Sequence, residues 1–283
     1  MTVELGKIGI WAHSSLLTPQ LAREVERAGY GAVWIGGSPS GDLAIVDDLL
    51  AATDHLAVAT GIVNIWSDDA VTVAASHRRI TAAFPNRFLL GIGVGHPEAV
   101  SDYKRPYKAL VDYLDVLDAE GVPQDERALA ALGPRVLQLS KDRSAGAHPY
   151  LTTPEHTRLA REQLGAGVLI APEQKVVLET DPDAARAVGR PAVQKPYLGL
   201  TNYVSNLKRL GWSDADLSDG GSDALIDALV ARGDARTAAA RVQQHLDSGA
   251  DHVPVQLLTP RGADPLPGYR ALAEVLLPPS SRG

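Results

Sequence analysis

The feature that most constrains the fold is a series of short apolar runs that are nearly continuous rather than alternating. Eight runs, separated by stretches of helical periodicity, span Lys7–Ala12, Ala32–Gly36, Leu56–Ile62, Arg87–Gly93, Ala128–Leu132, Ala147–Leu151, Gln174–Glu179 and His252–Leu258. Such runs are typical of strands buried on both faces, as in parallel sheets, which need helical crossovers between strands. The sequence therefore predicts an α/β fold, a (β/α)8 TIM barrel.

Helix signals fill the gaps between the runs. The first helix is the clearest, because Thr18 is suited to the N-cap, Pro19 to the first turn, and Gly29 to the C-terminal stop. The longest gap, residues 180–251, has room for two or three extra helices and predicts a helical insertion before the last strand. Because no linker composition interrupts the pattern, we expect a single domain over residues 1–283.

Composition excludes several classes of function. The net charge of −7, without a basic run, argues against nucleic-acid and anionic-membrane partners. The absence of cysteine removes disulfides, thiolate catalysis and Cys-ligated metals. The sequence shows neither a signal peptide nor an 18-residue apolar stretch, so we expect a cytoplasmic protein without a membrane span.

In a barrel of this kind the site lies at the carboxyl ends of the strands. His13 and His96 follow the first and fourth runs there. Either could act as a general acid or base, although a lone histidine is more often structural. Gly61, Gly93 and Gly95 also lie in or just after buried runs, which a flat ligand or simply a set of bulges would explain.

The segment Leu132-Gly133-Pro134 joins a strand end to a helix start. Free backbone N–H groups at a helix start can hold a phosphate, or the segment can be a plain capped helix. A Schiff-base aldolase is disfavoured, because Lys7 and Lys175 lie at the wrong ends of their strands. A metal site is not expected either, because His13 has no His-x-His partner.

Several segments together resemble a known family. They are AGYGAVWIG (28–36), LAVATGIVNIWSDDAVTVAA (56–75), NRFLLGIGVGHPE (86–98), ALGPRVLQLSKDRSAGAHPYLTTPEHTRLARE (131–162), APEQKVVLETDPDAAR (171–186) and NYVSNLKRLGW (202–212). In order and spacing they resemble the bacterial luciferase-like flavin-dependent oxidoreductases, and within them the subgroup that uses the deazaflavin coenzyme F420.

The resemblance implies a luciferase-like barrel that binds a flavin or deazaflavin over the strand ends. It implies a cis peptide at Gly61-Ile62 behind the ring and a phosphate seat at the fifth strand. The candidate cofactor-binding residues are Gly36, Gly37, Thr60, Gly61, Ile62, Asn64, Gly93, Gly95, Leu132, Gly133 and Pro134.

Two positions depart from the family's pattern. Several deazaflavin enzymes of this kind carry a catalytic histidine after the second strand, where this chain has Gly36-Gly37-Ser38. Some carry a glutamate after the fourth-strand glycines, where this chain has His96. His96 and His13 therefore remain as the candidate catalytic residues.

The resemblance favours an oxidoreductase that moves a hydride between reduced F420 and a small organic substrate. The alternatives are an FMN-dependent luciferase-like monooxygenase and a barrel that binds flavin or a metabolite without turnover. The resemblance also implies a homodimer, for which the apolar stripe of Leu43, Val46, Leu49 and Leu50 could serve as the interface. Alternatively, this stripe packs on the barrel.

Overall fold

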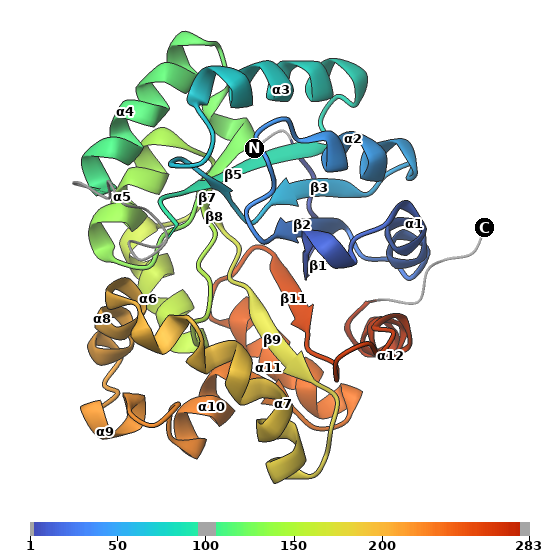
Figure 1. The fold of residues 1–283 in the computed structure, drawn as a ribbon, viewed down its shortest axis with the longest axis vertical. Helices are drawn as coiled ribbons and strands as arrows, with labels where there is room; N and C mark the ends of the chain where they lie inside the picture. The colour runs from blue at the N-terminus through green and yellow to red at the C-terminus, as the bar shows by residue number, and fades with distance from the viewer. Residues whose placement is uncertain (1–2, 96–105, 278–283) are drawn as a thin grey trace.

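A curled sheet of parallel strands forms the centre of the protein (Figure 1). The computed structural model describes residues 3–95 and 106–277. The strands are β1 (Ile8–His13), β2 (Ala32–Gly36), β3 (Ala57–Thr60), β4 (Val63–Asn64), β5 (Phe88–Gly93), β6 (Arg127–Leu129), β7 (Gly146–Ala147), β8 (Leu169–Ile170), β9 (Gln174–Val177), β10 (Val230–Arg232) and β11 (Val253–Leu257). Their order is β10-β9-β11-β1-β2-β3-β5-β6-β7-β8, with β4 beside β5.

The chain itself joins the two arms of this sheet. Strand β8 ends at Ile170, and β9 begins at Gln174 on the other arm. Close to this junction the N–H of Asp251, just before β11, donates to the carbonyl of Ile170 at 2.9 Å. The predicted α/β barrel of parallel strands is thereby confirmed, while the prediction of one domain over residues 1–283 stays a prediction.

The strands agree with the sequence prediction except where they are shortest. Strand β2 has the predicted bounds. The third predicted run, Leu56–Ile62, contains β3, and the short strand β4 follows beyond its predicted end. Strands β8 and β10, of two and three residues, were not predicted. They are too short to show any periodicity, and only pairing with their neighbours defines them.

Helices surround the sheet, as crossover connections require. They are α1 (Pro19–Arg27), α2 (Ala44–Ala51), α3 (Ala70–Ala83), α4 (Pro106–Ala119), α5 (Pro134–Arg143), α6 (Pro154–Leu164), α7 (Pro182–Gln194), α8 (Thr201–Arg209), α9 (Asp214–Leu217), α10 (Asp223–Leu229), α11 (Ala235–Asp247) and α12 (Leu266–Leu276). The start of α1 is as predicted: the N–H of Leu21 donates to the Thr18 hydroxyl at 3.1 Å, and Pro19 opens the helix. Among the described residues, no helix is long and apolar enough to cross a bilayer.

The predicted insertion lies between β9 and β11. It comprises α7 to α11 and β10, which adds an outer strand beside β9. In Figure 1 the helices α8, α9 and α10 lie together at the lower end of the molecule, far from α2 and α3. A short 3-10 helix, Tyr197–Gly199, connects α7 to α8.

The apolar stripe expected to form a dimer interface is buried instead. Leu43, Val46, Leu49 and Leu50 are all 0% exposed and belong to the main apolar core. The proposal that this stripe pairs two protomers is therefore wrong, because packing inside one protomer already covers it. Whether the protein forms a homodimer stays a prediction.

Candidate active site

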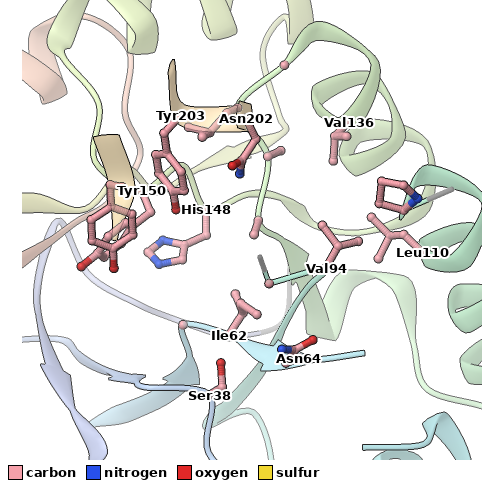
Figure 2. Close-up of a pocket in the computed structure, with 18 of the residues that line it drawn as sticks. Ser38, Ile62, Asn64, Val94, Leu110, Val136, His148, Tyr150, Asn202 and Tyr203 are labelled. Carbon is pink, nitrogen blue, oxygen red and sulfur yellow. The ribbon is translucent and has the colours of Figure 1, made fainter. Parts of the chain in front are cut away.

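A cavity of about 640 Å³ opens at the carboxyl ends of the strands. Figure 2 shows His148, Tyr150 and Tyr203 on one side of it and Val94, Leu110 and Val136 on the other. Its walls come from most of the barrel strand ends together with α4, α5, the 3-10 helix at 197–199 and α8. This is the position where ligands bind in barrels of this type.

Eight of the predicted site residues line the cavity. They are His13, Gly37, Gly61, Ile62, Asn64, Gly95, Leu132 and Gly133. Four others do not line it: Gly36, Thr60, Gly93 and Pro134. The Thr60 hydroxyl, for example, exchanges hydrogen bonds with the N–H and C=O of Gly91. His96 lies outside the described residues.

The peptide bond Gly61-Ile62 is cis, as the resemblance implied. It lies at the floor of the cavity, between β3 and β4. Glycine is required nearby, because a Cβ on Gly93 would come within 2.9 Å of the Ile62 side chain. These residues therefore form a close-packed ledge on which a flat group could rest.

His13 lies at the end of β1 and is exposed at the cavity. Its Nδ1 accepts from the backbone N–H of Ser15 at 3.2 Å and lies 2.9 Å from the hydroxyl of the same residue. Its Nε2 would be 2.4 Å from a Cβ on Gly37, whose φ is +80°. Glycine at position 37 thus leaves room for the imidazole beside the second strand end.

The start of α5 forms an anion-binding corner. Gly133 is the N-cap and provides no side-chain cap, and Pro134 has no N–H. The N–H of Val136 donates to the carbonyl of Gly133 at 3.1 Å, so Arg135 supplies the backbone N–H of the first turn that makes no hydrogen bond within the described residues. The Arg209 guanidinium, on α8, lies 3.5 Å from where a Cβ on Gly133 would be and donates to Asn206 Oδ1 at 3.1 Å. Backbone donors, the helix dipole and a guanidinium together suit a phosphate.

A row of aromatic rings makes up one wall. The ring centroids of Trp11 and Tyr150 are 5.1 Å apart, those of Tyr150 and Tyr197 5.3 Å, and those of Tyr197 and Tyr203 4.9 Å. Tyr197 and Tyr203 belong to the insertion, so the extra helices complete the cavity. Tyr197 and Tyr203 could not be predicted as site residues, because no periodicity connects the insertion to the strand ends.

A buried ion pair lies behind this wall. Lys175 Nζ is 3.2 Å from Glu173 Oε1, 3.1 Å from Gln256 Oε1 and 3.9 Å from the centre of the Tyr150 ring. Burial lowers the pKa of Lys175 and raises the pKa of Glu173, while the attraction between the two groups opposes both shifts. Because Tyr150 covers Lys175, this lysine does not line the cavity.

His148 lies just after β7, at the cavity, and was not predicted as a site residue. Its Nδ1–H donates to the carbonyl of Ala171 at 2.7 Å, and its ring stacks on Trp34 with centroids 4.1 Å apart. Burial lowers the pKa of His148 to about 4, so the imidazole is neutral at physiological pH.

The chain is similar to known proteins in sequence pattern and in fold. Residues 18–120 match the luciferase-like monooxygenase family model. An F420-dependent secondary alcohol dehydrogenase in complex with an F420-acetone adduct is 15% identical, with 96% of this chain and 98% of that chain covered and a TM-score of 0.73.

Two further solved structures have the same fold. The F420-dependent tetrahydromethanopterin reductase of Methanopyrus kandleri is 15% identical, with 96% and 99% coverage and a TM-score of 0.69. The oxygenating constituent of 3,6-diketocamphane monooxygenase from Pseudomonas putida, in complex with FMN, is 11% identical, with 97% and 98% coverage and a TM-score of 0.69. No curated protein matches the sequence.

At these identities the solved structures show a shared fold, and the family match adds a shared sequence pattern. The resemblance found in the sequence is thereby confirmed. Residues 18–120 have the sequence pattern of the luciferase-like monooxygenase family, in a chain that folds as a luciferase-like barrel.

Proposed function

We propose that the protein is an oxidoreductase that transfers a hydride between the deazaflavin F420 and a small organic substrate. The observation that carries the proposal is a single cavity that combines a flat ledge with an anion corner. The ledge is Gly61-Ile62, and the corner is the start of α5 with Arg209. Two of the solved structures with this fold are of F420-dependent enzymes.

The residues present fit such a cofactor. A side chain at Gly61 would reach within 2.7 Å of Trp11 Nε1, so glycine keeps the ledge open to a ring. The N–H of Arg135, the dipole of α5 and the Arg209 guanidinium would hold the phosphate. When bound, a deazaflavin supplies hydride chemistry, and the protein supplies orientation and exclusion of water.

The protein would also have to supply or accept a proton. We propose His13, which faces the cavity, and His96 for this role. Tyr150 is a poor donor, because burial raises the pKa of its hydroxyl well above the ordinary value and the hydroxyl already donates to Gln256 at 2.8 Å.

An FMN-dependent monooxygenase is the second candidate. The anion corner would accept the phosphate of FMN equally well, and one structure with the same fold holds FMN. The third alternative is a barrel that binds such a molecule without turnover. It would use the same cavity, and only the absence of a reaction would distinguish it.

Fluorescence titration and turnover separate these candidates. Trp11 lines the cavity, and Trp34 lies behind it in stacking contact with His148. We expect F420 to quench their emission at low micromolar concentration and FMN to do so only at much higher concentration. Tighter binding of FMN, with oxygen consumption, would favour the monooxygenase. Binding without any change of redox state across a substrate panel would favour the non-catalytic barrel.

A variant tests the position of the cofactor. Gly61→Val should weaken F420 binding by at least about a hundredfold, because its side chain would occupy the ledge and contact Trp11. The matched control is Ala51→Val, at an exposed position on α2. Unchanged F420 affinity in a folded Gly61→Val protein would contradict the proposed site.

A further inference from the structure

A buried histidine contacts one peptide of the anion corner from behind. His156 lies in the first turn of α6, is 3% exposed and does not line the cavity. Its Nε2 is 2.9 Å from the carbonyl oxygen of Leu132. Because a carbonyl oxygen only accepts, Nε2 carries the proton and donates it to this hydrogen bond. The carbonyl of Leu132 is therefore bonded to a donor that lies behind the cavity wall.

The direction of this carbonyl fixes the direction of the next backbone N–H. The peptide between Leu132 and Gly133 is trans, and the C=O and N–H of a trans peptide point to opposite sides. Since the carbonyl points at His156, the N–H of Gly133 points away from it. Gly133 lines the cavity, and its N–H makes no hydrogen bond within the described residues. This N–H is therefore a second free backbone donor at the anion corner, besides that of Arg135.

Glycine at position 133 makes the opposite orientation of this peptide accessible as well. Gly133 has φ −84° and ψ 155°. Turning the peptide over would bring the Leu132 carbonyl to the cavity side and give Gly133 a positive φ at unchanged ψ, a region essentially confined to glycine. A carbonyl oxygen facing the cavity would repel an anion. The backbone alone therefore does not hold the corner in the orientation that binds anions.

We propose that His156 is a positioning residue for the cofactor phosphate, because its hydrogen bond to Leu132 selects the peptide orientation that presents the N–H of Gly133. The assignment rests on the proposed function, since the anion is the phosphate of the bound cofactor. His156 acts through this peptide and contacts neither the cofactor nor the substrate.

The charge of the imidazole is not the source of the effect. Burial lowers the pKa of His156, the hydrogen bond to Leu132 opposes this shift, and the positive charge of Arg209 adds to it. The ring is therefore neutral at physiological pH. The positive charge of the corner comes from Arg209, which lines the cavity and donates to Asn206 Oδ1. Asn206 is 2% exposed, and its Nδ2 has no hydrogen-bond partner in the described part of the chain.

A matched pair of ligands tests this role on the purified full chain. FMN and riboflavin differ only in the phosphate, so the ratio of their affinities, measured by fluorescence titration, reports on the anion corner. We expect the wild type to prefer FMN. His156→Leu should reduce this preference about tenfold and leave riboflavin affinity unchanged, because the peptide is no longer held in place. His156→Gln can place an amide N–H near the Nε2 position and should keep the preference.

A second substitution tests the mechanism. Gly133→Ala disfavours the positive φ of the turned peptide, and its Cβ would lie in ordinary contact with Arg209, 3.5 Å away. In the double variant Gly133→Ala/His156→Leu the preference for FMN should therefore return. A purely structural role of His156 predicts no such recovery. His55→Leu, at an exposed histidine outside the cavity, is the matched control.

The amide of Gly133 gives a direct readout with inorganic phosphate as the probe. In ¹H–¹⁵N NMR spectra, phosphate should shift the Gly133 amide proton downfield in the wild type and in His156→Gln, but not in His156→Leu. No flavin or deazaflavin is present in this titration. A failure of F420 to bind would therefore contradict the proposed function and leave this result intact.

Specific results would overturn the proposal. One is a wild type that neither prefers FMN nor shows a phosphate shift at Gly133. Another is an unchanged preference in a folded His156→Leu protein. A third is an equal loss of FMN and riboflavin affinity, which would assign His156 to the fold alone. Thermal melts establish folding, and if His156→Leu is unfolded, His156→Asn, whose amide is too short to reach Leu132, takes its place.

Discussion

The two halves of the barrel are built differently. Strands β1, β2 and β5, in the first half, are five or six residues long, whereas β6, β7 and β8 are two or three. The first half fills the barrel interior with apolar groups such as Trp34, Ala59 and Leu89. The second half contributes buried Glu173, Lys175, His148 and Gln174.

The difference shows how polar side chains replace strand pairing in the second half. Glu173 Oε2 accepts from the backbone N–H of Leu151 at 3.2 Å, and Asp251 Oδ2 accepts from the N–H of Ile170 at 2.9 Å. His148 Nδ1 likewise bonds to the carbonyl of Ala171. These side chains satisfy backbone groups that would otherwise require longer strands. In the second half the strands are short and the interior is polar for the same reason: buried side chains take the place of backbone partners.

The largest expected effect comes from breaking the buried ion pair of the second half. Lys175→Met leaves Glu173 buried without its cation and should lower the free energy of unfolding by about 3–5 kcal/mol. Urea denaturation followed by circular dichroism measures the change.

Two controls sharpen this result. The double variant Glu173→Gln/Lys175→Met should recover most of the loss, because no unpaired charge remains. Lys108→Met, which removes an exposed pair with Asp112, should cost less than about 1 kcal/mol. A loss in Lys175→Met no larger than that in Lys108→Met would show that the second half does not depend on this pair.

A smaller effect concerns acid stability. Burial lowers the pKa of His252 to about 4, against about 6.5 when unfolded, so the unfolded chain binds more protons between these values. Stability should therefore fall as the pH drops from about 6.5 toward 4. Each such histidine contributes a loss of about 2 kcal/mol between pH 7 and 5.

His252→Gln checks this assignment. The Gln amide oxygen can accept from Trp34 Nε1, as His252 Nε2 does at 3.0 Å, but it does not titrate. Between pH 6.5 and 4 the unfolding free energy should depend less steeply on pH, by the amount that corresponds to binding of about one proton on unfolding. His55→Gln, at an exposed histidine, is the matched control. An unchanged slope in His252→Gln would assign the acid sensitivity to other groups.

The smallest effect tests a local signal in the first half. Thr18→Ala removes the oxygen that accepts from the N–H of Leu21 and should cost about 1 kcal/mol of stability. Thr18→Ser keeps this oxygen and should lose much less. Equal losses in the two variants would show that the cap is not the source of the effect. Thermal unfolding of both measures it.

Much of the fold could be predicted because its signals are local. The runs of β1, β2 and β5 are long enough to show burial on both faces, and Thr18-Pro19 marks a helix start within two residues. Strands β8 and β10 could not be predicted, because two or three residues have no period. The apolar stripe from Leu43 to Leu50 could not be assigned from the sequence either. An apolar helix face looks the same whether it packs on the barrel or on a partner protomer.

The candidate site was predictable only in part. The glycines at strand ends, the cis step at Gly61-Ile62 and the start of α5 have local or family signals. Tyr197, Tyr203 and Arg209 come from the insertion, and nothing in their own sequence indicates that they reach the cavity. His148 and Trp11 come from strand ends far apart in the sequence, and only the folded barrel brings both to the cavity beside Gly61.

The sequence by itself determined the alternation of strands and helices, the parallel barrel and the edge of the barrel where a site must lie. These follow from hydrophobic period, helix capping and the shared direction of parallel strands, all of which act over a few residues. The tertiary structure alone decided which buried groups are paired. Lys175 meets Glu173 and Gln256, whereas Trp11 and His148 are left facing the cavity. Hydrogen bonding depends on distances of a few tenths of an ångström between residues far apart in the chain, which no local pattern encodes.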